Sequence, residues 1–356
     1  MNIHKATKRY EAWVGKRTTL VPADLKSKHE RMAESPFLFF RGTLYRWAQL
    51  WPRVCPELAA APEVLGVGDL HVENFGTWRD VEGRLVWGMN DLDEVYWMSY
   101  ANDLVRLAAS AQLAAEAAHL DLIAKDAAEA ILEGYREGLE AGGRAFVLDG
   151  RHPWLREVAV SELREPVRYW KKMEALPRAR EVPESAREAL EALLPERSLQ
   201  YNLRTRVAGM GSLGHQRFVA LAEWRGGRVA REAKALVPSA WVWASDQPRS
   251  QEILYNSMLS RAVRCPDPFV HLRGHWVVRR LAPDCSRIEL ATLPKERHDL
   301  HLLHSMGFET ANAHLGSENA IRKIKKDLDE RPGNWLGKAA ARMADALRDD
   351  WKEWKG

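Results

Sequence analysis

The feature that most constrains the fold is a block of alternating apolar and polar residues, 199–283, which stands between two helical segments. Its first part, LQYNLRTRVAGMGSLGHQRFVALAEWRGGRVAREAKALV, has the period of two that is typical of antiparallel strands, with glycine turns between the runs. Two further strands, FVHLRG and HWVVRRLAP, are joined by Arg273-Gly274, and a helix is expected over 250–263. The block therefore predicts a small antiparallel sheet.

The chain on either side of this block has mainly helical patterns, such as the Ala-rich run 101–118 and the segment 122–139. Short strands are expected only at 64–67 and 84–89. A chain of 356 residues exceeds the size at which a single core usually keeps growing. We therefore expect an α+β fold of two lobes, in which 1–198 and 284–356 build a large helical lobe and 199–283 form a small β lobe.

Composition excludes several classes of protein. The net charge is only +4, which makes nucleic acid an unlikely main partner. The three cysteines, Cys55, Cys265 and Cys285, have no CxxC spacing, which argues against a disulfide framework or a structural zinc site and favours the cytoplasm. No apolar run approaches the length of a membrane span, so we expect no membrane insertion.

An acidic constellation follows the first predicted strand. Asp69, in GDLHVEN, can orient or deprotonate a hydroxyl, and Asn74 comes five residues later; Asp91 follows the next strand. Mg²⁺ prefers one or two protein carboxylates together with other oxygen ligands and phosphates, so this set predicts phosphoryl-transfer chemistry. Asp93 is either a second metal ligand or a solvated loop acid, and His71 is expected to orient the catalytic loop through hydrogen bonds.

A second motif lies in the predicted β lobe, where the string GMGSLG stands between two strands and Lys234 lies on the next one. Glycine lets the backbone approach phosphates closely, and a strand lysine supplies a point charge to phosphate oxygens. The string is not followed by a helix, which disfavours a dinucleotide-binding turn and favours a kinase-type glycine loop. The predicted nucleotide-binding residues of the string are Gly209, Gly211, Ser212 and Gly214.

Both motifs carry a resemblance to known families. The segments GDLHVENFG, NDLDE and NDLVRLA resemble the catalytic part of aminoglycoside and choline kinases, which implies that Asp69 is the catalytic base, Asn74 and Asp91 are magnesium ligands and Asp103 is a structural cap. With SPFLFFRG, KAL and Ala313-His314 added, most of the chain resembles the uncharacterised bacterial family catalogued as domain of unknown function 2252. That family name implies no substrate.

The order of the motifs departs from that of ordinary kinases, in which the glycine loop and lysine precede the catalytic loop. Here they follow it by 140 residues (209 − 69). A circularly permuted protein-kinase-like fold would account for this difference in order. In that fold Glu252, near the start of the helix expected at 250–263, is the nearest candidate to pair with Lys234, and the adenine-binding hinge is expected around Arg280 to Pro283.

These observations predict an ATP- and Mg²⁺-dependent phosphotransferase that acts on a hydroxyl group of a small molecule or a protein. Two alternatives use the same residues. A nucleotide-binding pseudokinase would regulate a partner without chemistry, and a nucleotidyl transferase would attach AMP to a protein. The sequence identifies neither the acceptor nor the oligomeric state.

Overall fold

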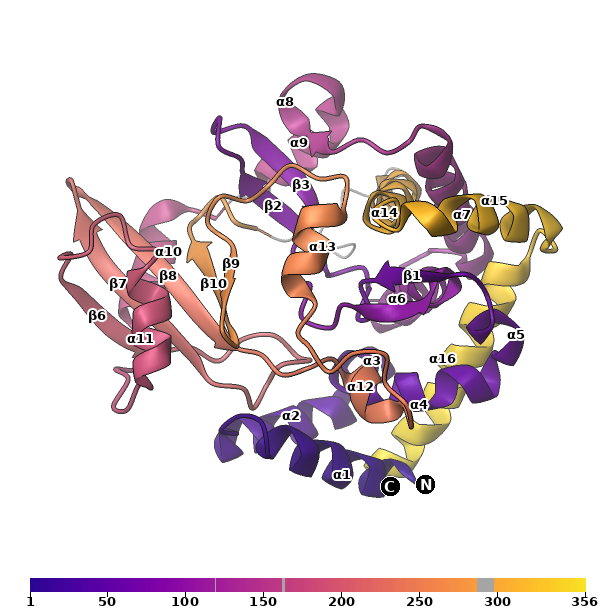
Figure 1. Ribbon diagram of the computed structural model, residues 1–356, viewed down its shortest axis with the longest axis horizontal. Coiled ribbons are helices and arrows are strands. Elements are labelled where there is room, and N and C mark those ends of the chain that lie inside the picture. Colours follow the sequence, from indigo (N-terminus) through magenta and orange to yellow (C-terminus); the bar gives the residue numbers. More distant parts are fainter. Residues whose placement is uncertain (119, 162–163, 287–297) are drawn as a thin grey trace.

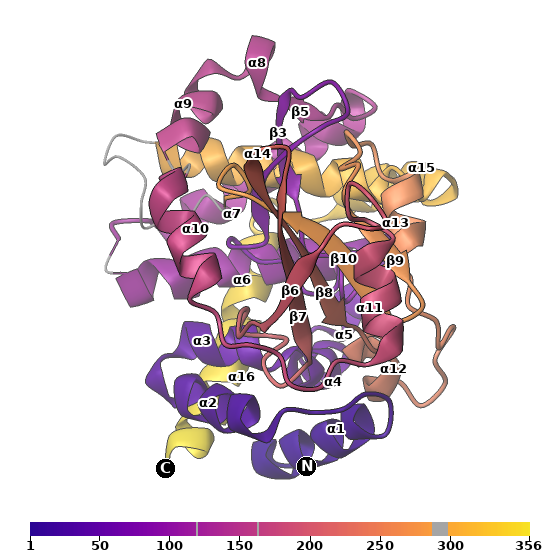
Figure 2. The same cartoon turned by 90° about the vertical axis from the view of Figure 1, so that its left-hand side faces the viewer.

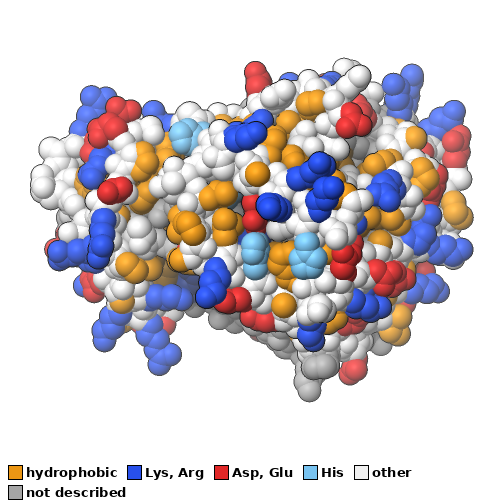
Figure 3. Space-filling view, turned by 90° about the horizontal axis from the view of Figure 1, so that it is seen from below, with side chains coloured by type: hydrophobic (Ala, Val, Ile, Leu, Met, Phe, Trp, Pro, Cys, Tyr) orange, Lys and Arg blue, Asp and Glu red, His pale blue; other side chains and the backbone are white. Residues whose placement is uncertain are grey.

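The computed structural model describes residues 1–118, 120–161, 164–286 and 298–356, and it is a mixed α/β structure with small antiparallel sheets. Figure 1 shows a five-stranded sheet on one side and a larger, mainly helical body on the other. The described part of the chain has no helix that is both long enough and apolar enough to cross a membrane. Lys and Arg side chains are interspersed with Asp and Glu on the face shown in Figure 3.

Five helices open the chain: α1 (Ile3–Gly15), α2 (Pro22–Glu34), α3 (Pro36–Gly42), α4 (Leu44–Val54) and α5 (Pro56–Ala59). The apolar run FLFFRGTLYRWAQLW is divided into α3 and α4 at the fully buried Thr43. The Thr43 hydroxyl donates to the carbonyl of Phe39 at 2.7 Å. This side-chain bond back to the preceding turn accompanies the break between the two helices.

The strands that follow carry the acidic loops. β1 (Glu63–Gly66) pairs antiparallel with β4 (Tyr96–Ser99), and β3 (Leu85–Met89) pairs with both β2 (Phe75–Arg79) and β5 (Phe146–Val147). The burial of β1 to β3 on nearly every position explains why their sequences are apolar rather than alternating. The loop that follows β1 and the loop that follows β3 lie close together.

Long helices form the main core around these strands: α6 (Tyr100–Ala118), α7 (Ala124–Glu140), α14 (His298–His314), α15 (Glu318–Glu330) and α16 (Trp335–Lys355). Sequences far apart along the chain thus share one core, since α14 packs against α7 and α16 against α6. Four short helices lie between: α8 (Leu148–Arg151), α9 (Pro153–Ser161), α10 (Pro166–Glu174) and α11 (Glu184–Glu191).

The predicted β block forms a five-stranded antiparallel sheet in the order β6-β7-β8-β10-β9. Its strands are β6 (Tyr201–Thr205), β7 (Arg217–Trp224), β8 (Gly227–Ala235), β9 (His271–Arg273) and β10 (Trp276–Leu281). Because side chains alternate along a strand, Phe218 and Ala220 pack under α11 on one face, whereas Val219 and Leu221 pack with α10 on the other. Figure 2 views the molecule from the side of this sheet and its two helices.

Two short helices connect β8 to β9, namely α12 (Ala240–Ala244) and α13 (Tyr255–Arg261). The helix expected over 250–263 is therefore shorter at both ends. The hydroxyl of Ser250 accepts a hydrogen bond from the backbone N–H of Glu252 at 3.1 Å, a local turn that competes with helix formation. Glu252 thus precedes α13 rather than lying on it.

Candidate active site

The loop that carries Asp69 is held from below by α6. The carboxylate of Asp103 accepts hydrogen bonds from the backbone N–H groups of Val67 at 2.6 Å and Gly68 at 3.0 Å, and it lies 3.1 Å from Nε2 of His314. Gly68 has a φ of +80°, and a Cβ on it would lie 2.2 Å from the carbonyl oxygen of Glu94. Only glycine fits there, so the loop after β1 and the acidic loop after β3 are in direct backbone contact.

Asn74 fastens these two loops together. Its Nδ2 donates to the carbonyls of Asp69 at 3.2 Å and Asp91 at 2.9 Å, and its Oδ1 accepts from the N–H of Asp91 at 3.0 Å. The side chain is buried. Its three hydrogen bonds fix the relative position of Asp69 and Asp91, while its role as a metal ligand stays a prediction.

Asp69 forms an ion pair with Arg106 of α6, whose side chain is fully buried and whose Nε lies 3.1 Å from Oδ1 of Asp69. The guanidinium stacks over Phe40, 4.0 Å from the ring centroid. Burial raises the pKa of Asp69, although Arg106 and Arg41 act in the opposite direction. Oδ2 faces the glycine loop, because a Cβ on Gly211 would lie 3.4 Å from it.

Lys234 meets the second acidic loop. Its Nζ contacts Oδ2 of Asp93 and lies 3.4 Å from Oδ1 of Asp91, and its side chain is completely buried. The pair of Lys234 with Asp91 joins residues 143 positions apart in the sequence. Glu252, expected to pair with Lys234, is exposed, and the carboxylates that contact Lys234 are those of Asp91 and Asp93.

Asp93 is the group in this cluster with an unsatisfied oxygen. Its Oδ1 is buried and has no hydrogen-bond partner among the described residues. Burial, followed by the neighbouring charge of Asp91, raises the pKa of Asp93 to about 6. The sequence left open whether Asp93 was a solvated loop acid, and the structure places it in the interior beside Lys234.

The glycine loop joins β6 to β7 and places Gly209 and Gly214 at φ values of +76° and +98°. The backbone N–H groups of Gly211 and Ser212 have no acceptor within the described part of the chain. The hydroxyl of Ser212 accepts from Nη2 of Arg217 at 2.6 Å. The loop therefore offers two N–H donors without an acceptor, between two glycines of positive φ, and backbone donors in such loops are of the kind that binds anions.

Arg217 is itself anchored from beneath the loop. Its Nη1 donates to Oε1 of Glu232 at 3.0 Å, and Arg206 contacts the other oxygen of the same carboxylate. Burial alone would raise the pKa of Glu232, but Arg217 and Arg206 hold it at about 2. The glycine loop is therefore supported by ionised groups on the inner face of the sheet.

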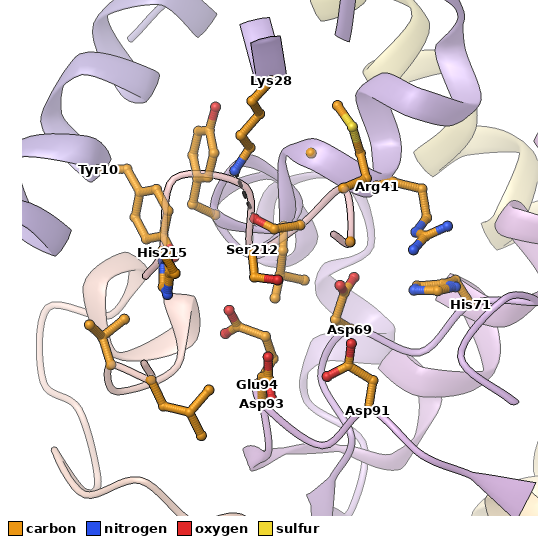
Figure 4. Close-up of a pocket in the computed structure, with 18 residues that line it drawn as sticks. Tyr10, Lys28, Arg41, Asp69, His71, Asp91, Asp93, Glu94, Ser212 and His215 are labelled. Carbon is orange, nitrogen blue, oxygen red and sulfur yellow. Dashed lines mark hydrogen bonds between the residues drawn. The ribbon is translucent and has the colours of Figure 1, made fainter. Parts of the chain in front are cut away.

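A cavity of about 50 Å³ lies where these elements meet. The predicted site residues around it are Asp69, His71, Asp91, Asp93, Gly209, Gly211 and Ser212. Figure 4 shows Asp69, Asp91 and Asp93 grouped on one side, with Ser212 of the glycine loop opposite them. Asn74, Gly214, Lys234 and Glu252 do not line the cavity, but Asn74 and Lys234 contact Asp91, which does.

Sequence reasoning missed several residues that line the cavity, including Lys28, Glu94 and His215. Glu94 belongs to the NDLDE string, and its Oε2 accepts from Ser239 Oγ at 2.9 Å and from the Ala240 N–H at 2.7 Å. Burial raises its pKa to about 7. Lys28 lies on α2, and its spacing of four residues from the buried Met32 places both on one face of the helix.

The segment expected to hold adenine, 280–283, uses backbone groups internally, since Arg280 and Leu281 pair with Arg231 and Ala230 of β8. The residues around its end are also bonded within the protein. The carbonyl of Ser286 accepts from the N–H of Thr77 at 2.8 Å, and that of Asp284 accepts from the Thr77 hydroxyl at 3.0 Å. The carbonyl of Pro283 accepts from the N–H of Arg164 at 3.2 Å. The backbone from 283 to 286 is thus fastened to β2 and to Arg164, which precedes α10.

The acidic cluster has the ligand types that a divalent cation prefers, but its side chains are not arranged as a metal site. The described residues contain no group of three or more His, Cys, Asp or Glu side chains that could hold a metal ion as they stand. The ammonium of Lys234 lies against Asp91 and Asp93, where it supplies the positive charge. The unsatisfied, buried Oδ1 of Asp93 nevertheless provides a free carboxylate oxygen of the type that Mg²⁺ prefers.

Comparison with known proteins gives one match. Residues 17–192 match the model of a family described as "Uncharacterized protein conserved in bacteria (DUF2252)". This match supports the predicted resemblance to an uncharacterised bacterial family. This segment contains the Asp69 and Asp91 loops and ends before the five-stranded sheet. No curated protein and no solved structure matches the chain.

Proposed function

We propose that the protein is an ATP- and Mg²⁺-dependent phosphotransferase that transfers a phosphoryl group to a hydroxyl of a small molecule or a protein. One observation carries this proposal: the loops of Asp69 and Asp91 and the glycine loop line the same cavity, although the first and the last are 140 residues apart (209 − 69). A general base, a carboxylate pair and an anion-binding loop around one space are the parts that phosphoryl transfer requires.

Each part has a defined task. The free N–H groups of Gly211 and Ser212 would bind phosphate oxygens, and Asp69, whose Oδ2 faces that loop, would accept or orient the proton of the acceptor hydroxyl. Asp91 and Asp93 would hold Mg²⁺, which neutralises charge on the phosphates when it is bound. Lys234 keeps these two carboxylates in place from the floor of the site.

A protein-kinase-like arrangement of the small lobe belongs to the same proposal. The glycine loop connects the first two strands of the five-stranded sheet, and Lys234 lies on the third strand, β8, with its ammonium against the acidic loop. The same succession of glycine loop and strand lysine defines the phosphate side of kinases. Circular permutation explains why these parts follow the Asp69 loop in the sequence.

Two observations favour a second candidate, a nucleotide-binding regulator without turnover. The cavity of about 50 Å³ is too small for a nucleoside triphosphate without movement of its walls, and Arg280 and Leu281 of the expected adenine segment are already paired with β8. A regulator would bind nucleotide and release none of its phosphates. Transfer of AMP to a protein uses the same groups with the nucleotide reversed, and mass spectrometry of the product separates it from phosphoryl transfer.

The proposal is tested by nucleotide turnover of purified variants with Mg²⁺, ATP and a panel of hydroxyl acceptors. Asp69→Asn should lower turnover by roughly 10²- to 10⁴-fold but retain binding of a non-hydrolysable ATP analogue, because it removes the base and leaves the phosphate donors intact. Asp91→Asn should weaken both turnover and Mg²⁺-dependent binding. The matched control is Asp349→Asn on the surface of α16, which should behave as wild type.

Two results would contradict the proposal. One is a wild-type protein that neither binds Mg²⁺·ATP nor turns it over; the other is an Asp91→Asn variant that keeps both activities unchanged. Binding without any turnover, together with a silent Asp69→Asn substitution, would favour the regulator instead.

A further inference from the structure

Lys28 is a buried lysine of the cavity to which the sequence motifs assign no role. It lies on α2, its side chain is only 6% exposed, and its Nζ donates to the carbonyl of Gly211 at 2.9 Å. Figure 4 shows it reaching toward the glycine loop from the side opposite the acidic cluster. Lys28 therefore connects the N-terminal helices to the loop whose N–H groups are free.

The other buried cations around this site each have a carboxylate partner. The pairs are Arg41 with Glu73, Arg106 with Asp69, Arg217 with Glu232, and Lys234 with Asp93. Lys28 has no carboxylate within ion-pair distance among the described residues, and the single carbonyl of Gly211 uses one of its three N–H donors. Burial lowers the pKa of Lys28, and Glu11, Glu94 and Asp69 oppose that shift only from further away.

A buried ammonium without a counter-ion is costly, and a ligand that supplies the anion removes that cost. The cavity offers further groups that match a polyphosphate: the free N–H groups of Gly211 and Ser212 lie in the loop that Lys28 contacts, and both residues line the same cavity as Lys28. Because the Gly211 carbonyl that Lys28 contacts and the Ser212 N–H point in opposite directions from one trans peptide, a chain of phosphates, rather than a single phosphate group, can reach both. Lys234, by contrast, is fully buried behind two carboxylates and does not line the cavity.

We infer that Lys28, together with the amides of Gly211 and Ser212, forms the phosphate-binding site of this cavity, and that Lys234 serves to position the acidic loop. The ligand class is a polyphosphate, either free or as the tail of a nucleotide. That the ligand is a nucleotide rests on the proposed function. The anion site itself is inferred from the local contacts of Lys28 alone. It places a binding residue on α2, outside the five-stranded sheet.

Calorimetric titration with two probes tests the inference: Mg²⁺ with a non-hydrolysable ATP analogue, and inorganic tripolyphosphate. Lys28→Met should weaken the binding of both probes by about tenfold to a hundredfold, as expected for the loss of one charge-assisted hydrogen bond. Lys28→Arg should retain part of the affinity. Lys26→Met is the matched control, because Lys26 lies on the same helix with its side chain 81% exposed, and it should leave both affinities unchanged.

Thermal melting separates a binding role from a merely structural one. Removing a buried charge that has no counter-ion should leave the ligand-free melting temperature of Lys28→Met equal to or above that of wild type, whereas Lys234→Met should lower it by removing the ammonium that Asp91 and Asp93 contact. Lys28→Gln replaces the Met variant if that variant does not fold. Wild-type affinity for both probes in a folded, neutral Lys28 variant would overturn the inference and leave the proposed function intact.

The converse outcome is distinguishable. Tripolyphosphate binding that depends on Lys28, without any binding of the ATP analogue, would uphold the anion site and contradict the ATP-dependent function. Failure of the wild-type protein to bind either probe would overturn both.

Discussion

At the scale of single residues, several buried carboxyl groups have a pKa that burial raises. Glu309 of α14 is a clear case outside the site: its side chain is 3% exposed, Oε1 accepts from the N–H of Met89 at 3.3 Å, and Oε2 accepts from Nδ2 of Asn312 at 2.7 Å. Burial outweighs these bonds and raises the pKa of Glu309 to about 7. The folded protein therefore favours the protonated form.

This shift predicts a pH dependence of stability. The contribution of Glu309 should be fully present below about pH 4.5, its ordinary value, and should be lost as the pH rises through about 7, by on the order of 3 kcal/mol in total. Glu309→Gln keeps the shape and cannot ionise. The free energy of unfolding, measured in denaturant, should decrease from pH 5 to pH 8 by more in the wild type than in Glu309→Gln. An equal decrease in both proteins would contradict the raised pKa of Glu309.

Motif residues could be predicted because their spacing is local, whereas their partners could not. Asp69, Asp91, Gly211 and Ser212 are predicted from short strings alone, and all four line one cavity, while their roles stay predictions. The contact of Lys28 with the glycine loop spans 183 residues, and no pattern along the sequence records such a distance.

At the scale of elements, the close crossing of α7 and α14 fixes the helical body. A Cβ on Gly134 would lie 1.9 Å from the carbonyl oxygen of His304, and one on Gly307 would lie 2.0 Å from that of Ile131. Each helix therefore contributes a glycine that lets the partner's backbone approach. These glycines serve packing rather than chain flexibility.

Gly134→Ala and Gly307→Ala should each destabilise the protein by roughly 1–3 kcal/mol or more, because the added methyl group meets backbone rather than a movable side chain. The control is Gly337→Ala in α16, where a Cβ would meet only the Cβ of Ala128 at an ordinary 3.6 Å. That substitution should be neutral or stabilising by up to about 1 kcal/mol. Denaturant unfolding of the three variants decides; equal effects at all three positions would refute the packing argument.

The elements themselves followed from the sequence where a period was clear. The expected strands at 64–67 and 84–89 correspond to β1 and β3, and the alternating block gives β6 to β10. The helix expected at 250–263 is shorter because the turn at Ser250 satisfies a backbone donor locally. The packing of α10 and α11 on the sheet could not be predicted, since apolar spacing marks a face and does not say what covers it.

At the scale of the whole molecule, the chain brings together parts whose sequence order gave no indication of contact. The acidic loops belong to the helical body, and the glycine loop and Lys234 belong to the five-stranded sheet. The ion pairs of Lys234 and the hydrogen bond of Lys28 join the two from opposite sides of one cavity. The central claim is that a single nucleotide polyphosphate engages both parts at once.

Hydrogen exchange with and without saturating Mg²⁺ and a non-hydrolysable ATP analogue measures this directly. The account predicts slower exchange of backbone amides in both 67–94 and 206–216, with Gly211 and Ser212 among the protected groups because their free N–H groups gain an acceptor. The crossing of α7 and α14 is the internal reference and should not change. Protection confined to one of the two segments, or absent from both, would contradict a shared phosphoryl-transfer site.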